Sequence, residues 1–435
     1  MKALVLGNGR SGKAAEALLC RSGFSVAVLD GEAVFPEGRF DLAVISPGIA
    51  LTHSWVVEAK RRGIPLKSEL QLGCEELKRQ GWKLLAVTGS KGKSSVVKVV
   101  ADAINLAGMK AVACGNYGTP VCDVALSGGA SGSRSSSDAR WAVVEVSSFM
   151  METTELPTDA FEAAVILNLQ EDHLDRHGSV EVYHELKRKL LTMAKQQFDL
   201  SPYPDFEALY KVFLDDDVRD FLGGSYFDND VLAPNGVAAL TLMLQAAKVG
   251  RKTARRAFDE FAPLPHRMNL VAEIGGVRYV DDSKATSISA LVAGVKMCQR
   301  VGFRRAPNWM RALCAGLGRS CCEQKPLSAP FVRLIAGGLP KGDDPKTALA
   351  TLTERVKKVY LIGQSAEAFF AAWNGAVDCE ICGRMERAVE AARREAEKGE
   401  TVLLSPGTAS FDQFKSYGER GDVFAQLVKE KGQPK

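Results

Sequence analysis

Short apolar runs recur along the chain, and each one ends in a polar or glycine-containing loop that leads into a segment of helical period. The apolar runs predict buried strands, and the longer amphipathic segments between them predict helices. Because strands that alternate with helices form parallel sheets, the pattern predicts an α/β protein with its loops gathered at the carboxyl edges of the sheets. A chain of 435 residues is too long for one core, so we expect about two to four domains.

The first apolar runs indicate a small Rossmann-like domain over residues 1–82. Residues 2–6 lead into the loop Gly7-Asn8-Gly9-Arg10-Ser11-Gly12, and the next run ends at Asp30. A strand, a G-x-G-x-x-G loop, a helix and an acid about twenty residues later are typical of dinucleotide binding. Taken alone, the loop predicts NAD or FAD, another nucleotide diphosphate, or a tight turn without a ligand. A third run ends at Ser46-Pro47-Gly48, the position at which ligands sit in open parallel sheets.

A second phosphate-binding pattern opens the next domain at residues 83–95, KLLAVTGSKGKSS. A strand, a loop with Gly-Lys-Ser and a helix form a geometry in which backbone N–H groups and the helix N-terminus face an anion. Lys93 would add a positive charge, and a hydroxyl of Ser94 or Ser95 would reach Mg²⁺. The loop is shorter than the usual P-loop, because Val87 stands where the first Gly is expected. An ordinary glycine-rich turn is the alternative.

Two further strands of this domain end in residues suited to a metal. Glu145 and His173 come directly after apolar runs, and His173 lies in a cluster with Glu171, Asp172, Asp175 and His177. A carboxylate and an imidazole at neighbouring strand ends, beside a phosphate loop, predict a Mg²⁺ environment. The alternative is that these charges are only solvated. A helix predicted over residues 181–197 carries Lys187, which by itself reads as a surface charge.

The sequence Pro263-Leu264-Pro265 predicts a linker to a third domain. Beyond it, four apolar runs end in polar loops, and the first two of these loops contain Asp281-Asp282-Ser283-Lys284 and Gly337-Gly338. We therefore predict another parallel sheet with its loops on one edge. The predicted domains are residues 1–82, 83–262 and 263–435.

Composition narrows the class of protein. The net charge of +4 is spread along the chain, and no basic-aromatic stripe argues for nucleic acid. No apolar run approaches the roughly 18 residues that span a bilayer, and the N-terminus turns to glycines too early for a signal peptide. Ten scattered cysteines without a C-x-x-C pattern, Cys321-Cys322 among them, indicate reduced thiols in a cytoplasmic protein. The Gly/Ser-rich residues 127–140 predict a mobile surface loop.

Several of these segments resemble the Mur ligase family, the ATP-dependent amide ligases of peptidoglycan precursor synthesis. The matching segments are TGSKGKSS, NLQEDHLDRH, and PLPHR followed by DDSKAT, and the family's phosphate loop has the short form seen here. Residues 404–424, LSPGTASFDQFKSYGERGDVF, and residues 46–53, SPGIALTH, resemble the members that add D-glutamate. The resemblance runs almost end to end. It implies a Rossmann-like UDP-binding domain, a central P-loop-type ATPase domain and a Rossmann-like C-terminal domain in a monomer.

The resemblance also implies a reaction and its residues. ATP would activate UDP-N-acetylmuramoyl-L-alanine as an acyl phosphate, and D-glutamate would then attack it. The residues implied for the UDP-substrate are Arg10, Ser11, Asp30, Ser46, Asn116 and Ser147. Those implied for ATP are Gly89, Ser90, Lys91, Gly92, Lys93, Ser94, Ser95, Asn235, His266, Arg267 and Asp282. Those implied around two Mg²⁺ ions are Ser94, Ser95, Glu145, His173 and a carbamylated Lys187.

Lys93, His173 and Lys187 would be the catalytic residues of such a ligase. The residues implied for D-glutamate are Lys284, Thr286, Lys341, Ser410, Phe411 and Tyr417. The chain departs from the family pattern at Lys91, Ser95, Met150, Leu232 and Tyr417, and its stretch between Lys187 and Asn235 is short. The alternatives are a sibling ligase, meaning another Mur enzyme or a folylpolyglutamate synthetase-like enzyme, and a non-catalytic binder of nucleotides or UDP-sugars. An NAD enzyme would leave the second phosphate loop unexplained.

Overall fold

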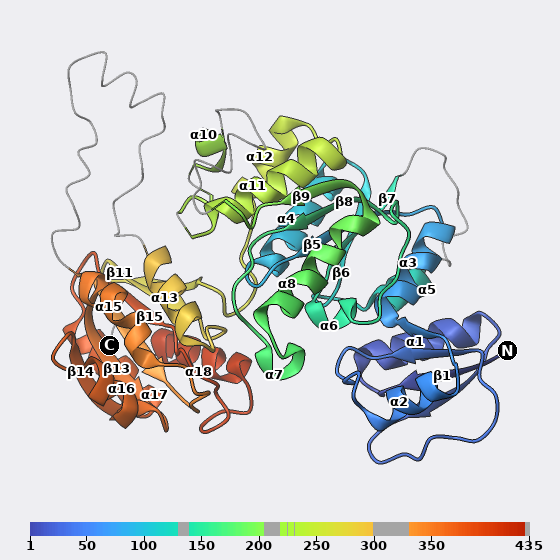
Figure 1. The fold of residues 1–435 in the computed structure, drawn as a ribbon. Coiled ribbons are helices and arrows are strands. Elements are labelled where there is room, and N and C mark those ends of the chain that lie inside the picture. Colours follow the sequence, from blue (N-terminus) through green and yellow to red (C-terminus); the bar gives the residue numbers. More distant parts are fainter. Residues whose placement is uncertain (129–138, 204–217, 224, 230, 299–329, 431–435) are drawn as a thin grey trace. The chain divides into compact units, whose positions relative to one another are not determined.

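The computed structural model describes residues 1–128, 139–203, 218–223, 225–229, 231–298 and 330–430. They form two compact units, one made of Met1–Asp228 and Leu232–Phe261 and the other of Asn229–Val231 and Ala262–Lys435. The first unit holds a four-stranded and a five-stranded sheet, and the second holds a six-stranded sheet (Figure 1). The predicted α/β class with three sheets is confirmed. No helix in the described ranges is long and apolar enough to cross a membrane.

The four-stranded sheet is parallel and has the strand order β2-β1-β3-β4. Its strands are β1 (Lys2–Leu6), β2 (Ser25–Leu29), β3 (Leu42–Ile45) and β4 (Leu66–Ser68). Helix α1 (Arg10–Arg21) covers one face and α2 (Ser54–Arg61) the other (Figure 1). Alternate residues of β1 divide between the faces, since Ala3 and Val5 share a core with α1, whereas Leu4 and Leu6 share one with α2.

The glycines of the first loop are required by close backbone packing. Gly7 has φ +96°, and a Cβ added to Gly12 would lie 1.8 Å from the carbonyl oxygen of Gly7. The Ser46 hydroxyl donates to that same oxygen at 3.0 Å. The pattern that resembles a dinucleotide fingerprint therefore has a steric cause within the fold.

The five-stranded sheet is parallel and has the order β6-β7-β5-β8-β9. Its strands are β5 (Lys83–Thr88), β6 (Lys110–Gly115), β7 (Arg140–Glu145), β8 (Phe161–Ile166) and β9 (Ala194–Asp199). Helix α4 (Lys93–Leu106) packs on one face, backed by α11 (Ala233–Thr241) and α12 (Arg251–Asp259). Shorter helices of this unit are α6 (Ser148–Met151), α7 (Leu174–His177) and α10 (Val218–Leu222), with a π-helical turn at Leu242–Ala246.

The helix predicted over residues 181–197 is wrong at its end. Helix α8 (Val180–Lys189) is followed by a 3₁₀ turn at Leu191–Met193 and then by β9. Strand β9 lies at the edge of the sheet, where Lys195 and Gln197 are exposed. Because polar residues interrupt this edge strand, it lacks the continuous apolar run from which a strand is predicted.

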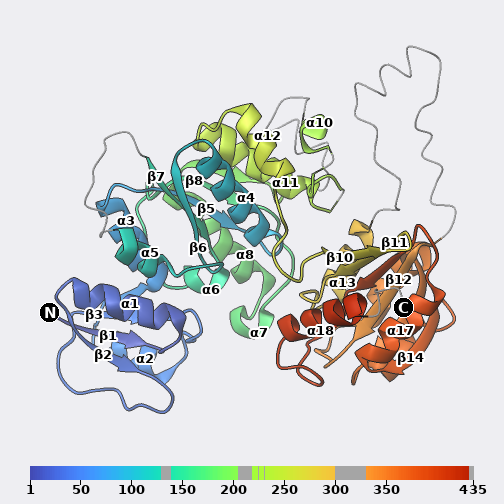
Figure 2. The same cartoon turned by 180° about the vertical axis from the view of Figure 1, so that it is seen from behind.

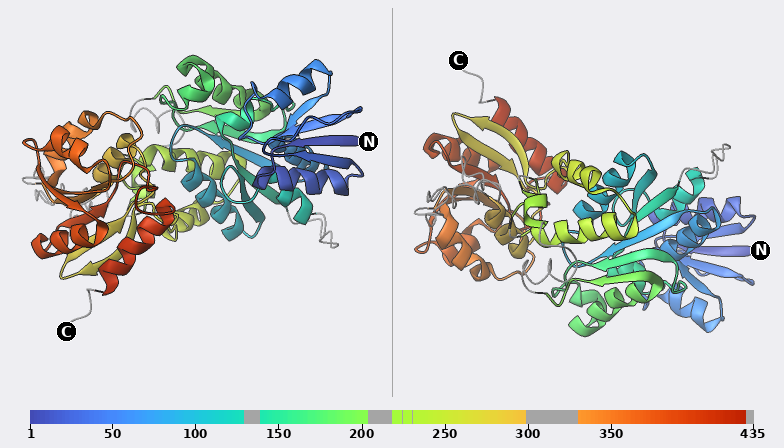
Figure 3. Two further views of the ribbon diagram at one scale, coloured as in Figure 1. Left: turned by 90° about the horizontal axis from the view of Figure 1, so that it is seen from below. Right: turned by 90° about the horizontal axis from the view of Figure 1, so that it is seen from above.

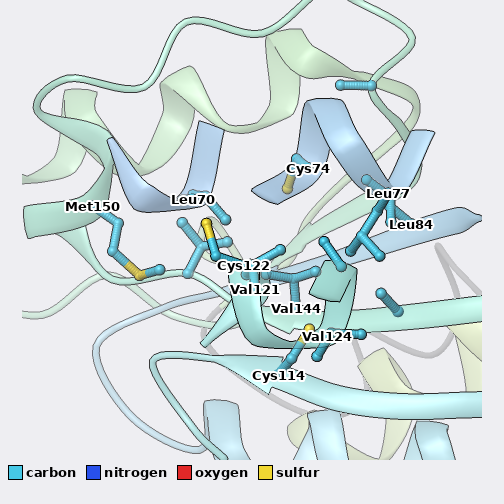
Figure 4. Packing of buried hydrophobic residues seen from close by; sticks show 14 of the residues in the cluster. Leu70, Cys74, Leu77, Leu84, Cys114, Val121, Cys122, Val124, Val144 and Met150 are labelled. Carbon is cyan, nitrogen blue, oxygen red and sulfur yellow. The ribbon is translucent and has the colours of Figure 1, made fainter. Parts of the chain in front are cut away.

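The two sheets of the first unit share one hydrophobic core. Helices α3 (Glu69–Arg79) and α5 (Val121–Gly128) pack on each other and on α1, and their side chains meet those of the five-stranded sheet (Figure 4). Arg21, at the end of α1, donates to the carbonyl oxygens of Ala125 and Leu126 at 3.0 and 2.8 Å. The first sheet is thereby attached to the second through three helices.

The six-stranded sheet of the second unit has the order β10-β11-β15-β12-β13-β14. Its strands are β10 (Asn269–Ile274), β11 (Val277–Asp281), β12 (Val332–Gly337), β13 (Val356–Ile362), β14 (Asp378–Gly383) and β15 (Thr401–Leu404). One face is covered by α13 (Ile288–Met297), α15 (Leu349–Arg355) and α16 (Ala366–Trp373), near a 3₁₀ turn at Pro345–Ala348. The other face is covered by α17 (Met385–Glu395) and α18 (Tyr417–Glu430) (Figure 2).

The prediction of a wholly parallel third sheet is wrong at one edge. Strand β10 runs antiparallel to β11, and both contact α18 (Figure 3). Gly275 and Gly276 join the strands with φ values of +60° and +79°. Two consecutive glycines at positive φ form the tight turn of a hairpin, which could have been predicted from the Gly-Gly pair.

Two expectations fall wholly or largely outside the described residues. Residues 129–138 make up most of the Gly/Ser-rich segment, and the Cys321-Cys322 pair lies within residues 299–329. The cysteines that the structure does describe are free thiols.

We predict that Gly12→Ala destabilises the protein by about 3 kcal/mol, because the new methyl group must displace the Gly7 carbonyl. Urea unfolding followed by circular dichroism would measure the loss. The matched control is Gly48→Ala, where an added Cβ meets nothing within 4 Å. Equal stability of the two variants would contradict the steric explanation.

Candidate active site

The loop between β5 and α4 is held in shape by two other segments, those of Asn168 and Asn235. Gly92 has φ +87°, and a Cβ added there would lie 2.3 Å from Nδ2 of Asn235. The Asn168 side chain accepts from Lys91 N at 2.9 Å and donates to Lys91 O at 3.0 Å. Ser90 N donates to Asn168 O at 3.0 Å. The loop therefore has a fixed conformation that only glycine permits at position 92.

Two lysine ammonium groups meet at one carbonyl oxygen of this loop. Lys93 Nζ donates to Gly89 O at 2.8 Å, and Lys187 Nζ donates to the same oxygen at 2.9 Å. Lys93 Nζ also donates to Ser90 O at 3.1 Å. Lys93 begins α4, whereas Lys187 comes from α8, so two helices bring like charges to one point. An anion such as a phosphate would relieve their repulsion.

Lys187 is among the most buried charged side chains in the described part of the chain, with only 2% of its surface exposed. Burial lowers the pKa of Lys187 to about 7, and the charge of Lys93 adds to this effect, whereas Asp172 and Glu145 oppose it. A lysine with so low a pKa is partly a neutral amine at neutral pH. It therefore has the chemistry of a nucleophile rather than of a surface charge.

Tyr183 connects the phosphate loop to the histidines. Its hydroxyl lies 3.0 Å from the Ser90 hydroxyl, and its ring lies 4.6 Å below Lys187 Nζ. The same ring lies 6.1 Å from the His173 ring and 5.6 Å from the His177 ring, centroid to centroid. Tyr183 and Lys187 are one helical turn apart, so both project from the same side of α8.

Glu145 ends β7 and is buried, with 2% exposure. Its Oε1 accepts from Asn116 Nδ2 at 2.7 Å, whereas its Oε2 is buried and has no hydrogen-bond partner. A buried carboxylate oxygen without a hydrogen-bond partner lowers the stability of the fold unless a ligand binds to it. Ser94 and Ser95 are also buried, in the first turn of α4.

His173 is placed at the start of α7 in a left-handed conformation, with φ 54°. Its side chain is 46% exposed, and its ring centroid lies 4.9 Å from that of Phe149, with the two rings tilted by 54°. The exposed ring leaves a nitrogen available to a ligand, while the backbone is fixed by the helix that follows.

These residues fit a magnesium site if other oxygens complete it. Among the described residues there is no group of three or more His, Cys, Asp or Glu side chains that could hold a metal ion. The orphaned oxygen of Glu145 nevertheless matches the hard oxygen ligands that Mg²⁺ prefers. Mg²⁺ commonly takes its remaining ligands from substrate phosphates and water, so a sparse protein set is the expected one.

The predicted UDP-substrate residues of the first unit are only partly available. Arg10 Nη2 donates to Gly118 O at 2.7 Å, and Ser46 donates to Gly7 O. Ser147 caps α6 by accepting from Met150 N. Asp30 is exposed directly after β2, and Ser11 is half-buried in α1. Arg10 and Ser46 therefore also serve to fasten loops to one another.

In the second unit, the predicted nucleotide residues form a group around β11. His266, with φ +60°, contacts Asp281 through Nδ1 and Oδ2 at 2.7 Å. Asp282 is turned away and accepts from the Ser405 hydroxyl at 3.0 Å. Burial raises the pKa of Asp282 to about 7, with Ser405 opposing the shift. Arg267 lies beside this group, and its N–H donates to Asn269 Oδ1.

The residues predicted for D-glutamate are brought together in part. Lys284 Nζ lies 4.0 Å above the ring of Tyr417. Leu339 and Ala409 exchange backbone hydrogen bonds, which places the segment of Lys341 beside that of Ser410 and Phe411. Phe411 is 70% exposed, Lys341 is exposed, and Thr286 is half-buried.

Sequence reasoning missed the residues that hold these groups in place. Arg420 is fully buried and donates to Ser283 Oγ and O and to the carbonyls of Thr408 and Ala409. Burial lowers the pKa of Arg420 to about 10. Asp281, the partner of His266, was passed over in favour of its neighbour. The Asp-Asp pair was a signal, since successive residues at a strand end point to opposite sides.

Comparison with known proteins gives one consistent result. The model of the Mur ligase middle domain matches residues 87–201. The UDP-N-acetylmuramoylalanine--D-glutamate ligase of Chlamydia caviae is 32% identical, with 98% of this chain and 97% of the relative covered. The protein of that name from Nitratidesulfovibrio vulgaris is 32% identical, with 98% and 95% covered.

Solved structures share the fold. A MurF ligase from Thermotoga maritima in complex with ADP matches with a TM-score of 0.55 at 16% identity, covering 99% of this chain and 95% of that chain. A pseudomurein peptide ligase type C from Methanothermus fervidus matches with a TM-score of 0.53 at 13% identity, covering 99% of both. At such low identities, the similarity supports a shared arrangement of helices and strands only.

We predict that the free energy of unfolding of the wild type rises between pH 7 and pH 9, and that Lys187→Met removes this rise. In the wild type, the unfolded chain holds a proton on Lys187 that the folded chain has lost above its pKa of about 7. The free energy of unfolding therefore rises with pH, by up to about 1.4 kcal/mol per unit, until the unfolded lysine also titrates. Urea unfolding in bicarbonate-free buffer would measure the slope.

The control for this prediction is Lys60→Met, which changes an exposed lysine of α2. It should keep the wild-type slope. If the free energy of unfolding changed with pH equally in the wild type and in Lys187→Met, burial would not lower the pKa of Lys187.

Proposed function

The chain belongs to the Mur ligase family, and we propose that it is the ATP-dependent ligase that adds D-glutamate to UDP-N-acetylmuramoyl-L-alanine in peptidoglycan precursor synthesis. The observation that carries the proposal is full-length similarity: relatives with this activity in their names match 98% of the chain at 32% identity. The phosphate loop, the lysines Lys93 and Lys187 that meet at it, and the buried Glu145 support the proposal, because such a ligase needs groups that bind phosphates and a metal.

The reaction joins a carboxylate to an amine, which requires a better leaving group than oxide. A carboxylate oxygen of the UDP-substrate attacks the γ-phosphorus of ATP, and ADP leaves. The amine of D-glutamate then attacks the acyl carbon, and phosphate leaves. Lys93 and the N-terminus of α4 would bind the phosphates and stabilise the transferring charge, and the position of Lys93 at the phosphate loop supports this role.

We assign the metal ligands to Ser94, Glu145, His173 and a carbamylated Lys187. Bound Mg²⁺ supplies charge neutralisation and orientation to the phosphoryl group. The amine of Lys187 is neutral often enough to attack carbon dioxide: an N–C bond forms, a proton leaves, and the cation becomes a carboxylate-like anion. That change would also end the repulsion between Lys187 and Lys93 at Gly89 O.

The remaining assignments follow the three sheets. We propose that residues 1–82 bind the UDP end through Arg10, Ser11, Asp30 and Ser46, with Asn116 and Ser147 on the muramoyl-alanine portion. Residues 83–262 would bind the ATP phosphates. Asn235, within residues 83–262, is assigned to the nucleotide. Residues 263–435 would bind adenine and ribose through His266, Arg267 and Asp282, and D-glutamate through the set around Lys284. We further propose a monomer that acts in the cytoplasm, where ATP and reduced thiols occur.

The purified chain is expected to release phosphate from ATP only when both UDP-N-acetylmuramoyl-L-alanine and D-glutamate are present with Mg²⁺. A colorimetric phosphate assay with each substrate omitted in turn would test this. Repeating the assay with a panel of amino acids separates this activity from that of a sibling ligase. Binding of both nucleotides without any turnover would favour a non-catalytic binder instead.

Lys187→Ala is expected to reduce turnover by about a hundredfold or more, because the site loses a metal ligand. Short carboxylates or bicarbonate should partly restore its activity, since they can occupy the space of the carbamate. The control is Lys60→Ala, which should retain wild-type turnover and show no response to acetate. A fully active Lys187→Ala variant would refute the role of the modified lysine.

A further inference from the structure

An arginine outside the assigned sites ties two loops of the first unit together. Arg176 Nη2 donates to the carbonyl oxygen of Ile49 at 2.8 Å and lies 3.4 Å from that of Pro47. Both carbonyls belong to the loop that leaves β3 at Ser46. Arg176 itself lies on α7, which leaves the five-stranded sheet after β8. One side chain thus bridges the loop ends of two sheets.

The bridging guanidinium has a defined orientation. Its Nε and Nη2 donate to the two carboxylate oxygens of Glu152 at 3.0 and 2.7 Å. The side chains of Arg176 and Glu152 are only 16% and 8% exposed, and the guanidinium lies 5.0 Å above the ring of Phe149. A bidentate pair shielded from water fixes geometry in a way that an exposed ion pair does not.

The same contacts place the histidine at the start of α7. The backbone N–H groups of Arg176 and His177 both donate to His173 O at 3.1 Å. A helix of four residues has no stability of its own, so its position depends on its side-chain contacts. His177 adds a contact to the Ser148 hydroxyl at 3.0 Å and one to Glu152 at 3.4 Å. Glu152 therefore holds two of the four residues of α7.

The bridged segments pack closely around a gap that has no room for a water molecule. Its lining includes Ser46, Pro47 and Ile49 from the first sheet and Phe149 and Glu152 from the second. A ligand that moves the carbonyl of Ile49 must either carry the guanidinium with it or leave a largely buried donor unpaired. Because Nη2 serves Ile49 and Glu152 at once, the movement reaches the anchor of α7 directly.

We propose that Arg176 is a positioning residue that couples occupancy of the loop at 46–49 to the placement of His173. Binding of the UDP-linked substrate and binding of Mg-ATP then become mutually dependent. This inference rests on the proposed function, which assigns Ser46 to the first ligand and His173 to the metal. Coupling of this kind is reciprocal, so it can be measured from either ligand.

The test is calorimetric titration of the full chain with β,γ-imido-ATP and Mg²⁺, with and without UDP-N-acetylmuramoyl-L-alanine and without D-glutamate. In the wild type, we expect the UDP-substrate to change the nucleotide affinity by about fivefold or more. In Arg176→Met, we expect the UDP-substrate to change the nucleotide affinity by less than about twofold. No turnover occurs in the assay, so the readout is binding alone.

The matched control is Arg255→Met. Arg255 also makes a bidentate pair with a carboxylate, Asp259, at 2.7 and 3.0 Å, and also donates to two carbonyl oxygens, those of Phe221 and Gly223. These partners all lie in or beside α10 and α12. The variant loses the same kind of contact and should keep the wild-type coupling factor.

Three results would overturn the proposal: a wild type without coupling, an Arg176→Met variant with the wild-type factor, or an equal loss in Arg255→Met. If Arg176→Met does not fold, Arg176→Lys replaces it, since lysine keeps the charge but cannot make the bidentate pair and the Ile49 contact together. Failure of the proposed function looks different, because the wild type would then bind no UDP-substrate and release no phosphate.

Discussion

The meeting of two ammonium groups at Gly89 O is the constraint on which the candidate site depends. Lys93 and Lys187 are held there by α4 and α8, and Lys187 is buried. Like charges in a poorly solvated place raise the free energy of the folded chain unless an anion or a chemical change compensates. The loop cannot relax away from them, because Asn168 clamps Lys91 and Asn235 lies against Gly92. The proposed binding of a phosphate and the proposed modification of Lys187 would each relieve this repulsion.

Sequence reasoning found the parts of this site whose chemistry is local. Glu145 and His173 each follow an apolar run directly, and Lys93 belongs to the glycine-containing loop after another, so the strand pattern predicts all three at one sheet edge. Lys187 carried no such signal and was noticed only through the resemblance. Its burial comes from α8 packing beside the loop, a long-range contact that no local pattern encodes. The clamp by Asn168 was hidden for the same reason.

The errors in the fold have equally physical causes. Edge strands such as β9 bury one face at most, so they lack the apolar run by which central strands are recognised. The pairing of His266 with Asp281 could not be predicted, because extended backbone sends successive side chains to opposite sides and only packing shows which side His266 occupies. The glycines of the first loop could not distinguish NAD from a UDP-sugar, since the backbone alone requires Gly12.

The core shared by α1, α3 and α5 has a consequence for how such a protein can be inherited. A fragment ending at residue 82 would carry α3 without α5. The apolar side chains of Leu70, Cys74 and Leu77 would then be exposed to water. Each large apolar side chain returned to water costs about 1.5–3 kcal/mol, and the resulting patch would promote aggregation. Recombination between homologous genes should therefore exchange the first two sheets together. Crossovers should be tolerated after Phe261 and not at the junction before β5.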